Sequence, residues 1–199
     1  MTSPGTDQHH ETTFHLDAAA LKVLAHPLRS RLLSALRRGG PSTATELAAL
    51  LSTNTGATSY HLRKLESVGL VADTGEGEGK RRLWRAATDA HEWTASDFAG
   101  DEDAQTALGW LVRDYNRLLG QRFERWLDVE AEWPLPWRDA SGMSDRWVLA
   151  TAEQAQALKT ELDQLLARYR DAGAGRPDAR RLAVYTVLFP EDLDAGPGA

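Results

Sequence analysis

The residues with the clearest chemistry lie in a short polar segment, 53–64, in which hydroxyl-bearing side chains precede basic ones. Short polar side chains at the start of a helix can hydrogen-bond to base edges in the major groove of DNA, and arginine can bind such edges through two donors. We therefore predict base contacts from Thr55, Ser59 and Tyr60, and a contact from Arg63 to a base or a phosphate.

Other residues of this segment favour a close approach to the phosphate backbone. Thr53 and Lys64 carry groups that bind phosphates, and such contacts position a protein on DNA without reading its sequence. Gly56 and Ala57 lack bulk and would let the start of the helix lie close to the duplex. The role of His61 stays open between a DNA contact and a packed side chain, because its spacing also suits the core face of a helix.

A second basic group, Lys80, Arg81 and Arg82, follows a glycine-rich stretch at 73–79. At a hairpin tip these side chains would hold the DNA backbone or enter a minor groove, and a solvated run of charges is the alternative. The alternating glycines also resemble a phosphate-binding loop. They precede a strand rather than a helix, so no helix N-terminus is present there to bind a phosphate.

Seven tryptophans are present, and six of them lie outside residues 15–88. Trp84 is interpreted as a cross-strand or core residue. The other six either belong to a core or form the walls of an apolar pocket for a small organic effector. The tryptophans assigned to this candidate effector pocket are Trp110, Trp126, Trp133, Trp137 and Trp147.

No pattern in the chain predicts catalysis. The absence of cysteine excludes disulfides, thiolate metal sites and cysteine nucleophiles. The histidines lack plausible partners, and no nucleotide loop or nucleophile motif is present. His9, His10 and His15 could form a metal-binding tract, but a solvated tail is the better interpretation. We therefore expect no catalytic residue, no metal site, no cofactor and no enzyme activity.

Helix signals dominate the elements that must position these groups. Asp17 can cap a short helix over 18–25, and Pro27 can begin a second helix that Gly39 and Gly40 end. Leucines recur at helical spacing within that second segment. The first part of the chain is therefore predicted to be helical.

A helix-turn-helix follows, with its second helix carrying the polar segment. The hydroxyl groups and glutamate of 42–46 predict a capped helix start, and the polar turn 52–56 interrupts that helix. A second helix is predicted over 56–68, with Gly69 ending it. Two helices joined by so short a turn are typical of a helix-turn-helix.

The pattern then changes to short strands at 70–72 and 83–86, with the glycine-rich stretch as the hairpin between them. A helix-turn-helix followed by such a hairpin predicts a winged helix.

The remaining chain is less regular. Residues 87–100 are interpreted as a linker, and 101–129 as a long helix whose apolar stripe suits a partner chain. A strand at 146–150, a helix capped by Thr151 and a strand at 182–189 follow. This order permits a parallel strand pair with a right-handed crossover, and a hairpin-like arrangement is the alternative.

The predicted fold class is mainly α with a small β component (α+β): a winged helix-turn-helix domain plus a helical or α-β C-terminal region. The predicted divisions are a disordered tail at 1–14, the winged helix-turn-helix DNA-binding domain at 15–88, a C-terminal dimerisation and candidate effector domain at 89–190, and a tail at 191–199.

Charge separates these regions. The chain carries a formal net charge of -6, but residues 21–88 hold 11 Lys and Arg against 5 Asp and Glu, a local charge of +6. A basic block inside an acidic chain is the electrostatic footprint of a polyanion-binding surface. No apolar stretch approaches the roughly 18 to 20 residues of a membrane helix, and the N-terminus is not typical of a signal peptide. We therefore expect a cytoplasmic protein without a membrane partner.

The motifs also carry a family resemblance. The sequences LAHPLR at 24–29, ELA at 46–48, TSYHLRKLE at 58–66 and GLV at 69–71 resemble those of ArsR-type winged helix-turn-helix transcriptional regulators. The motifs lie between residues 24 and 71, and the C-terminal extension resembles a cysteine-free branch of that family. The resemblance implies a dimeric DNA-binding protein, most commonly a repressor.

Metal sensing does not follow from the resemblance. Metal-sensing members of the family place cysteines in the first helix of the helix-turn-helix, where this sequence reads ELAALL at 46–51. The long helix at 101–129 contains no histidine pair at the spacing of metal ligands.

The predicted function is a sequence-specific DNA-binding transcriptional regulator, a repressor by resemblance, that binds an imperfect palindrome in double-stranded DNA as a homodimer and is released by a small organic effector. The first helix, 17–25, and the long helix, 101–129, are the expected dimer interface. The alternative is a winged-helix module for protein-protein interaction without specific DNA binding.

Overall fold

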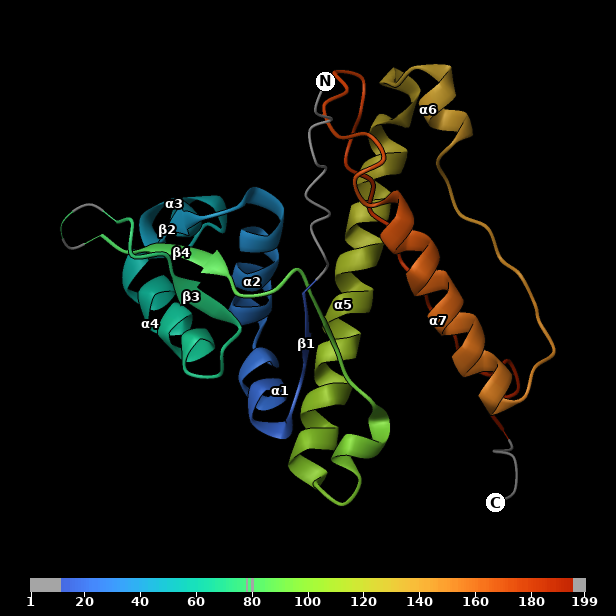
Figure 1. Ribbon diagram of the computed structural model, residues 1–199, viewed down its shortest axis with the longest axis horizontal. Coiled ribbons are helices and arrows are strands. Elements are labelled where there is room, and N and C mark those ends of the chain that lie inside the picture. The colour runs from blue at the N-terminus through green and yellow to red at the C-terminus, as the bar shows by residue number, and fades with distance from the viewer. Residues whose placement is uncertain (1–11, 78, 80, 195–199) are drawn as a thin grey trace, which may run out of the picture. The chain divides into compact units, whose positions relative to one another are not determined.

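The computed structural model describes residues 12–77, 79 and 81–194. The fold is mainly α with a small β component, as predicted (Figure 1). The chain divides into two compact units, which we call the N-terminal unit, residues 1–121, and the C-terminal unit, residues 122–199. The predicted domain boundary at residue 88 stays a prediction.

Two helices with strong start signals open the N-terminal unit. Helix α1, Ala18–Leu24, begins after Asp17, whose carboxylate accepts a hydrogen bond from the Ala20 N–H at 2.7 Å. Helix α2, Pro27–Gly39, begins after His26, whose Nδ1 accepts from the Leu28 N–H at 3.1 Å. Each cap satisfies a backbone donor that has no partner inside the helix, which explains why both helices begin where the sequence predicts.

Helix α3, Ala44–Leu50, and helix α4, Thr55–Glu66, form the predicted helix-turn-helix. Thr43 and Glu46 make a capping box at the start of α3, with Thr43 N–H donating to the Glu46 carboxylate at 2.8 Å. The chain turns beyond α4 at Gly69, where φ is +75°. Only glycine adopts this backbone conformation without steric cost, so the helix ends close to the predicted position.

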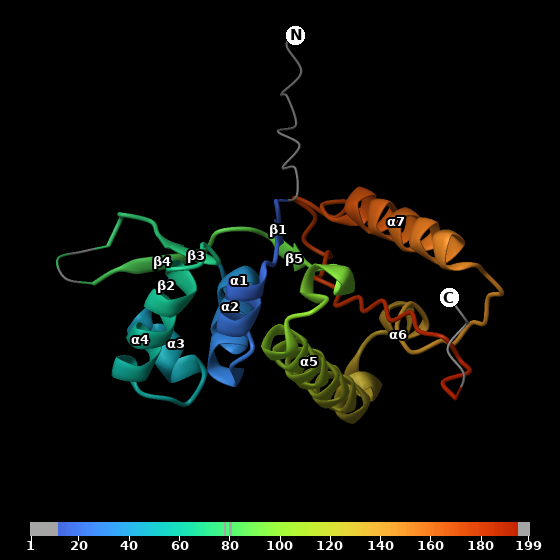
Figure 2. The ribbon, with the colours of Figure 1, turned by 90° about the horizontal axis from the view of Figure 1, so that it is seen from below.

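A three-stranded sheet completes the winged helix. Strands β3, Val71–Asp73, and β4, Leu83–Ala86, form the predicted hairpin. Strand β2, Ser42–Thr43, adds to β4 and gives the order β2-β4-β3, all antiparallel. Figure 2 shows β3 and β4 leading away from α1 and α2 toward the hairpin tip. Strand β2 was not predicted because a two-residue strand carries no alternation in its sequence.

One hydrophobic core joins these elements. Leucines of α2 and α4 pack with Trp84 of β4, which is buried as predicted. The fully buried leucines of these two helices are Leu32, Leu33, Leu36, Leu62 and Leu65.

Two further strands correct the interpretation of the tail and the linker. Strand β1, Thr13–His15, pairs in parallel with β5, Ala90–Glu92. The predicted disordered tail at 1–14 is therefore wrong for residues 12–14, whereas His9 and His10 lie outside the described residues. Three-residue strands whose partner lies over 70 residues away have no local signal, so only the tertiary pairing defines them.

The long helix was predicted correctly. A 3-10 turn, Ala95–Phe98, places Phe98 in the core of the N-terminal unit and leads into α5, Glu102–Val129. The first part of α5 buries Ala104 and Leu111 in the same core. The linker therefore packs on the winged helix through Phe98 and Trp93.

The C-terminal unit contains the end of α5, a 3-10 turn at Glu130–Glu132, α6 at Leu135–Asp139 and α7 at Ala152–Tyr169. The predicted capping box is present, because the Thr151 N–H donates to Gln154 Oε1 at 2.9 Å. The strands predicted at 146–150 and 182–189 are wrong for the single chain, since both segments are extended without strand pairing. Strand propensity needs a neighbouring strand to produce a strand, and neither segment pairs with the other.

Candidate nucleic-acid interface

The start of α4 is held by its cap and by one buried hydroxyl group. Asn54 Oδ1 accepts from the Ala57 N–H at 2.8 Å, and the Thr58 hydroxyl donates to the Asn54 carbonyl at 3.0 Å. Thr58, Leu62 and Leu65 are buried and form the inner face of the helix. The opposite face of α4 is therefore left toward solvent.

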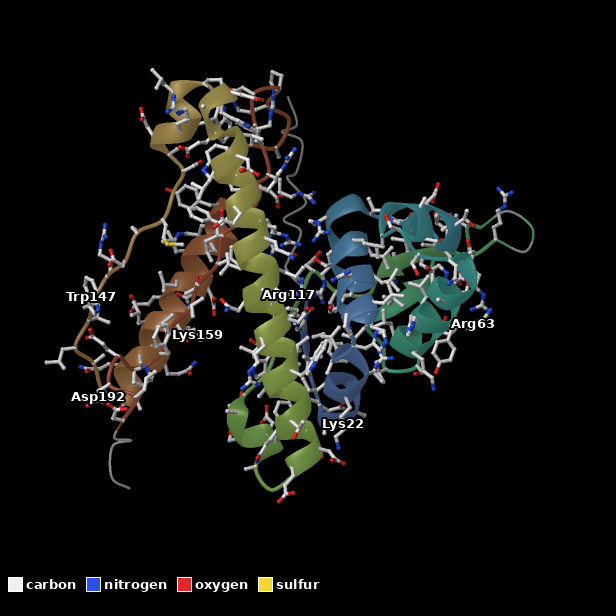
Figure 3. All side chains as sticks on the ribbon, turned by 180° about the vertical axis from the view of Figure 1, so that it is seen from behind. Lys22, Arg63, Arg117, Trp147, Lys159 and Asp192 are labelled. Atoms are coloured by element: carbon white, nitrogen blue, oxygen red, sulfur yellow. The ribbon has the colours of Figure 1, made fainter. Side chains whose placement is uncertain are left out.

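The outer face carries most of the residues predicted to contact DNA. Thr55, Gly56, Tyr60, Arg63 and Lys64 are exposed. Figure 3 shows Arg63 on the outer side of α4, away from α1 and α2. Thr53, Ala57 and Ser59 are partly exposed. A helix with this distribution can enter a major groove with its polar face first.

A groove of about 190 Å³ lies between this face, the start of α3 and the base of the wing. It brings together five of the predicted DNA-contacting residues, Thr55, Ser59, Arg63, Arg81 and Arg82. Its other lining residues are Thr43, Ala44, Thr45 and Trp84. Three guanidinium groups beside several hydroxyl groups match the chemistry of a phosphate or a base edge.

The groove includes a residue that the sequence interpretation missed. Thr45 is exposed in the first turn of α3 and lines the groove. The capping box at Thr43 and Glu46 marks a helix start and so places Thr45 in the first turn of α3. That signal was available in the sequence but was used only to place the helix.

The wing arginines differ in their surroundings. Arg82 lies between two carboxylates, with Nη1 3.6 Å from Glu66 and Nε 3.4 Å from Asp73. Its guanidinium also lies 5.6 Å from the centre of the Trp84 ring. Arg82 is thus oriented at the base of the wing and part of its charge is neutralised. Lys80 lies outside the described residues.

The close approach of the two arms of the wing requires glycine at position 77. A Cβ on Gly77 would overlap the carbonyl oxygen of Arg81, so the two arms of the hairpin pass too close for any side chain. The glycines therefore serve the hairpin geometry rather than a phosphate loop.

His61 faces α2 instead of the outer surface. Its ring lies 4.5 Å from that of His26 between centroids, tilted by 36°, and its Nδ1 is buried without a hydrogen-bond partner among the described residues. Burial is the main cause that lowers the pKa of both histidines, and the nearby Arg29 lowers each pKa further. Both rings are therefore neutral near pH 7, and the packed alternative for His61 has geometric support.

A partly buried polar network, absent from the sequence interpretation, connects α2, β5 and α5. Arg37 donates to the carbonyl oxygens of Thr88 and Ala90, each at 2.9 Å, and to His91 Nδ1. Because arginine is always a donor, His91 Nδ1 is the acceptor and Nε2 carries the proton. His91 Nε2 then donates to the Tyr115 hydroxyl at 2.8 Å.

Burial lowers the pKa of His91 to about 4, and the Arg37 charge adds to the shift. Burial also raises the pKa of the Tyr115 hydroxyl. The network stays uncharged apart from Arg37 and holds the segment after the wing against two helices.

The candidate effector pocket is only partly assembled. Trp126 and Trp133 lie 5.5 Å apart in an edge-to-face arrangement, and Trp133 and Trp137 lie 6.1 Å apart in a similar one. The indole Nε1 of Trp126 is buried without a hydrogen-bond partner among the described residues. Trp110 belongs to the N-terminal unit, and Trp147 is 71% exposed on the segment before α7 (Figure 3).

Within the part of the chain that the structure describes, no cluster of three or more His, Cys, Asp or Glu side chains could hold a metal ion. No helix among the described residues is long and apolar enough to cross a membrane.

Comparison with known proteins supports the helix-turn-helix. Residues 24–74 match the family described as Helix-turn-helix domain. A solved structure from Mycobacterium bovis, the homodimeric winged helix-turn-helix DNA-binding domain of Mb0332, a possible ArsR-family transcriptional regulator, is 26% identical. The match covers 51% of this chain and 80% of that one, with a TM-score of 0.33. No curated protein matches the chain. The predicted helix-turn-helix is confirmed by the family match and by the geometry of α3 and α4.

Proposed function

We propose that this protein is a sequence-specific DNA-binding transcriptional regulator. Its residues 24–74 match a helix-turn-helix domain. It binds an imperfect palindrome as a homodimer and acts in the cytoplasm as a repressor. The observation that carries the proposal is the groove between α3, α4 and the wing. There, Arg63 and Arg81 lie beside the hydroxyl groups of Thr45, Thr55 and Ser59.

Helix α4 is the recognition helix of this proposal. Its first turn, with Thr55, Ser59 and Tyr60, enters the major groove and contacts base edges. The small residues Gly56 and Ala57 keep that turn close to the duplex. Arg63, one turn further along, reaches a base or a phosphate from the wall of the groove.

The surrounding residues supply phosphate contacts. Thr45 and Thr53 stand at the starts of α3 and α4, and Lys64 lies on the exposed side of α4. Arg81 and Arg82 approach the backbone or a minor groove from the wing. The local charge of +6 over residues 21–88 attracts DNA to the same surface at short range.

A binding site selected from random DNA tests the proposal. The full-length protein is expected to enrich one sequence, and the affinity for that sequence should fall steeply between about 50 and about 200 mM salt. A winged helix that serves only protein-protein contacts would enrich no sequence, and that outcome would refute the proposal.

The effector part of the proposal rests on the aromatic cluster Trp126, Trp133 and Trp137. Three indole rings in edge-to-face contact form an apolar wall, and the buried Trp126 Nε1, which has no hydrogen-bond partner among the described residues, is a donor for a ligand oxygen that enters the cluster. A small organic effector should change tryptophan fluorescence, and Trp133→Phe should reduce that change more than Trp147→Phe. A folded protein whose fluorescence responds to no compound of a broad panel would count against an effector.

The homodimer of this proposal needs a surface beyond α1. The apolar face of α1, with Ala20, Leu21 and Leu24, is already buried in the N-terminal unit. On α5, Trp110 and Val112 are each 45% exposed, so their side chains can contact a second copy of the chain. The interface predicted from α1 and α5 stays a proposal, carried mainly by α5.

A further inference from the structure

One extended segment of the C-terminal unit, residues 182–189, exposes an unusual amount of apolar surface. Its six large apolar side chains are 43% to 71% exposed, and they are Leu182, Val184, Tyr185, Val187, Leu188 and Phe189. Among the described residues, no backbone-backbone hydrogen bond involves this segment. The Tyr185 hydroxyl accepts a hydrogen bond from Arg122 of α5 at 2.6 Å.

An extended apolar segment with unpaired backbone groups is an open strand edge. Val, Tyr and Phe favour strands, and an unprotected edge readily adds another strand. The exposed surface of the six side chains amounts to roughly 600 Å² per chain. Pairing two such segments edge to edge covers part of this surface, because side chains lie on the faces of a strand pair, and it satisfies the backbone groups of both segments.

We propose that residues 182–189 of two copies of this chain pair as antiparallel strands about a two-fold axis. The proposal rests on the homodimer of the proposed function and names a surface for it. The charges that flank the segment select this partner and this direction. Arg180 and Arg181 precede the strand, whereas Glu191 and Asp192 follow it.

Antiparallel pairing brings the basic end of one copy to the acidic end of the other, and this complementarity stabilises the pair. Parallel pairing would place arginine beside arginine and carboxylate beside carboxylate. A second copy therefore places opposite charges side by side at both ends of the segment. The same residues make the contact on each chain, as a two-fold axis requires.

The same charges select a register. When the axis passes through Thr186, Arg181 lies opposite Glu191 and Arg180 lies opposite Asp192 of the partner. Thr186 then faces its own copy, and a Thr–Thr pair is favourable across two strands. Arg180 donates to the carbonyl oxygens of Pro177 and Ala179, which keeps it at the start of the segment.

Disulfide formation tests this register, because the chain contains no cysteine. In the variant Thr186→Cys, the two thiols would lie about 4.5–5.5 Å apart at Cβ, within reach of a disulfide after small adjustment. Mild oxidation of the full-length protein should convert most of it to a covalent dimer that reductant reverses. The control Thr160→Cys, on an exposed position of α7 in the same unit, should stay largely monomeric in a denaturing gel.

Charge reversal gives a second, independent readout. Arg180→Glu or Asp192→Arg alone should raise the dimer dissociation constant about tenfold, because like charges then face each other across the pair. The double variant should restore it, as measured by sedimentation or light scattering of the full-length protein. Restoration would not follow if each substitution merely disturbed its own chain.

Three results would overturn the proposal: a monomeric full-length protein, no more cross-linking at Thr186→Cys than at Thr160→Cys, or no rescue by the double reversal. All measurements are made without DNA, so they separate the two proposals. A cross-linked dimer that selects no DNA sequence refutes only the proposed function, and a DNA-binding dimer without the cross-link refutes only the strand pair.

Discussion

Arg63 and Lys64 are neighbours on α4, yet their surroundings give them different expected roles. Arg63 lines the groove, whereas the Lys64 ammonium lies 5.8 Å from the centre of the exposed Tyr60 ring. Arg63→Ala should lower the affinity for the selected site by about 1–3 kcal/mol more than the affinity for random DNA, because a base contact carries sequence information. Lys64→Ala should weaken both by the same amount. Fluorescence anisotropy with both DNAs checks this, and equal losses for Arg63→Ala would assign Arg63 to phosphate.

His91 makes stability depend on pH in a defined window. Its pKa is about 4 in the folded chain and near 6.5 when unfolded. Above pH 6.5 both states are neutral and His91 adds no pH dependence. As the pH falls from 6.5 to 4, the unfolded state takes up the proton first, so the folded state loses stability by about 3 kcal/mol. Denaturant unfolding at several pH values measures this loss.

The variant His91→Gln separates this histidine from the others. Glutamine keeps polar atoms near Arg37 and Tyr115 but does not titrate, so its stability should vary less between pH 6.5 and 4 than that of the wild type. The lowered pKa values of His26 and His61 act in the same direction and leave a residual slope in both proteins. Identical slopes would show that His91 is not the titrating group.

At the scale of elements, α4 depends on its N-cap. Asn54 Oδ1 satisfies the Ala57 N–H, and truncation leaves that donor to solvent. Asn54→Ala should lower the free energy of unfolding by about 1 kcal/mol, whereas Asn54→Asp should largely retain it. Asn116→Ala, at an exposed position of α5, provides a control with the same substitution. Equal stabilities for Asn54→Ala and Asn116→Ala would contradict the role of the cap.

The helices were predictable because their signals are local. Asp17, the Thr43–Glu46 box and Thr151 with Gln154 each act within four residues, and the structure contains all three caps. Much of the site followed from the same pattern, since a capped polar helix after a short turn places its hydroxyl groups and Arg63 on one face. The ion pairs of Arg82 and the His61–His26 contact were not predictable, because their partners come from other elements.

The strands depended on distant partners and were predicted less well. Strand β1 exists because β5 lies beside it, although neither segment alternates in hydrophobicity. Residues 182–189 have the composition of a strand but pair with no strand among the described residues. In both cases the missing information is the identity of the partner strand, which composition does not contain.

At the scale of the whole molecule, an acidic chain carries a basic surface. The net charge of -6 repels DNA at long range, whereas the +6 of residues 21–88 attracts it once the two are within a screening length of about 10 Å. The local charge therefore determines the affinity for DNA. Phosphate contacts should account for most of the change of that affinity with salt concentration. The wing is the place to test this, because its arginines are distant in sequence from the recognition helix.

Replacing Arg81 and Arg82 together by alanine should weaken binding to every DNA sequence and flatten its salt dependence. Each phosphate contact contributes about 0.9 to the slope of log affinity against log salt. Arg82 shares its charge with Glu66 and Asp73, so the slope should fall by about 1 rather than about 2. Arg81→Ala alone should account for most of the change.

The control replaces Arg138 and Arg146 by alanine, which lowers the net charge by the same amount within the C-terminal unit. If net charge governed binding, both double variants would weaken it equally. If the basic surface governs it, only the wing variant changes the slope, because counterions are released only where phosphates are contacted. An unchanged slope in the wing variant would remove Arg81 and Arg82 from the DNA interface and leave α3 and α4 as the whole contact surface.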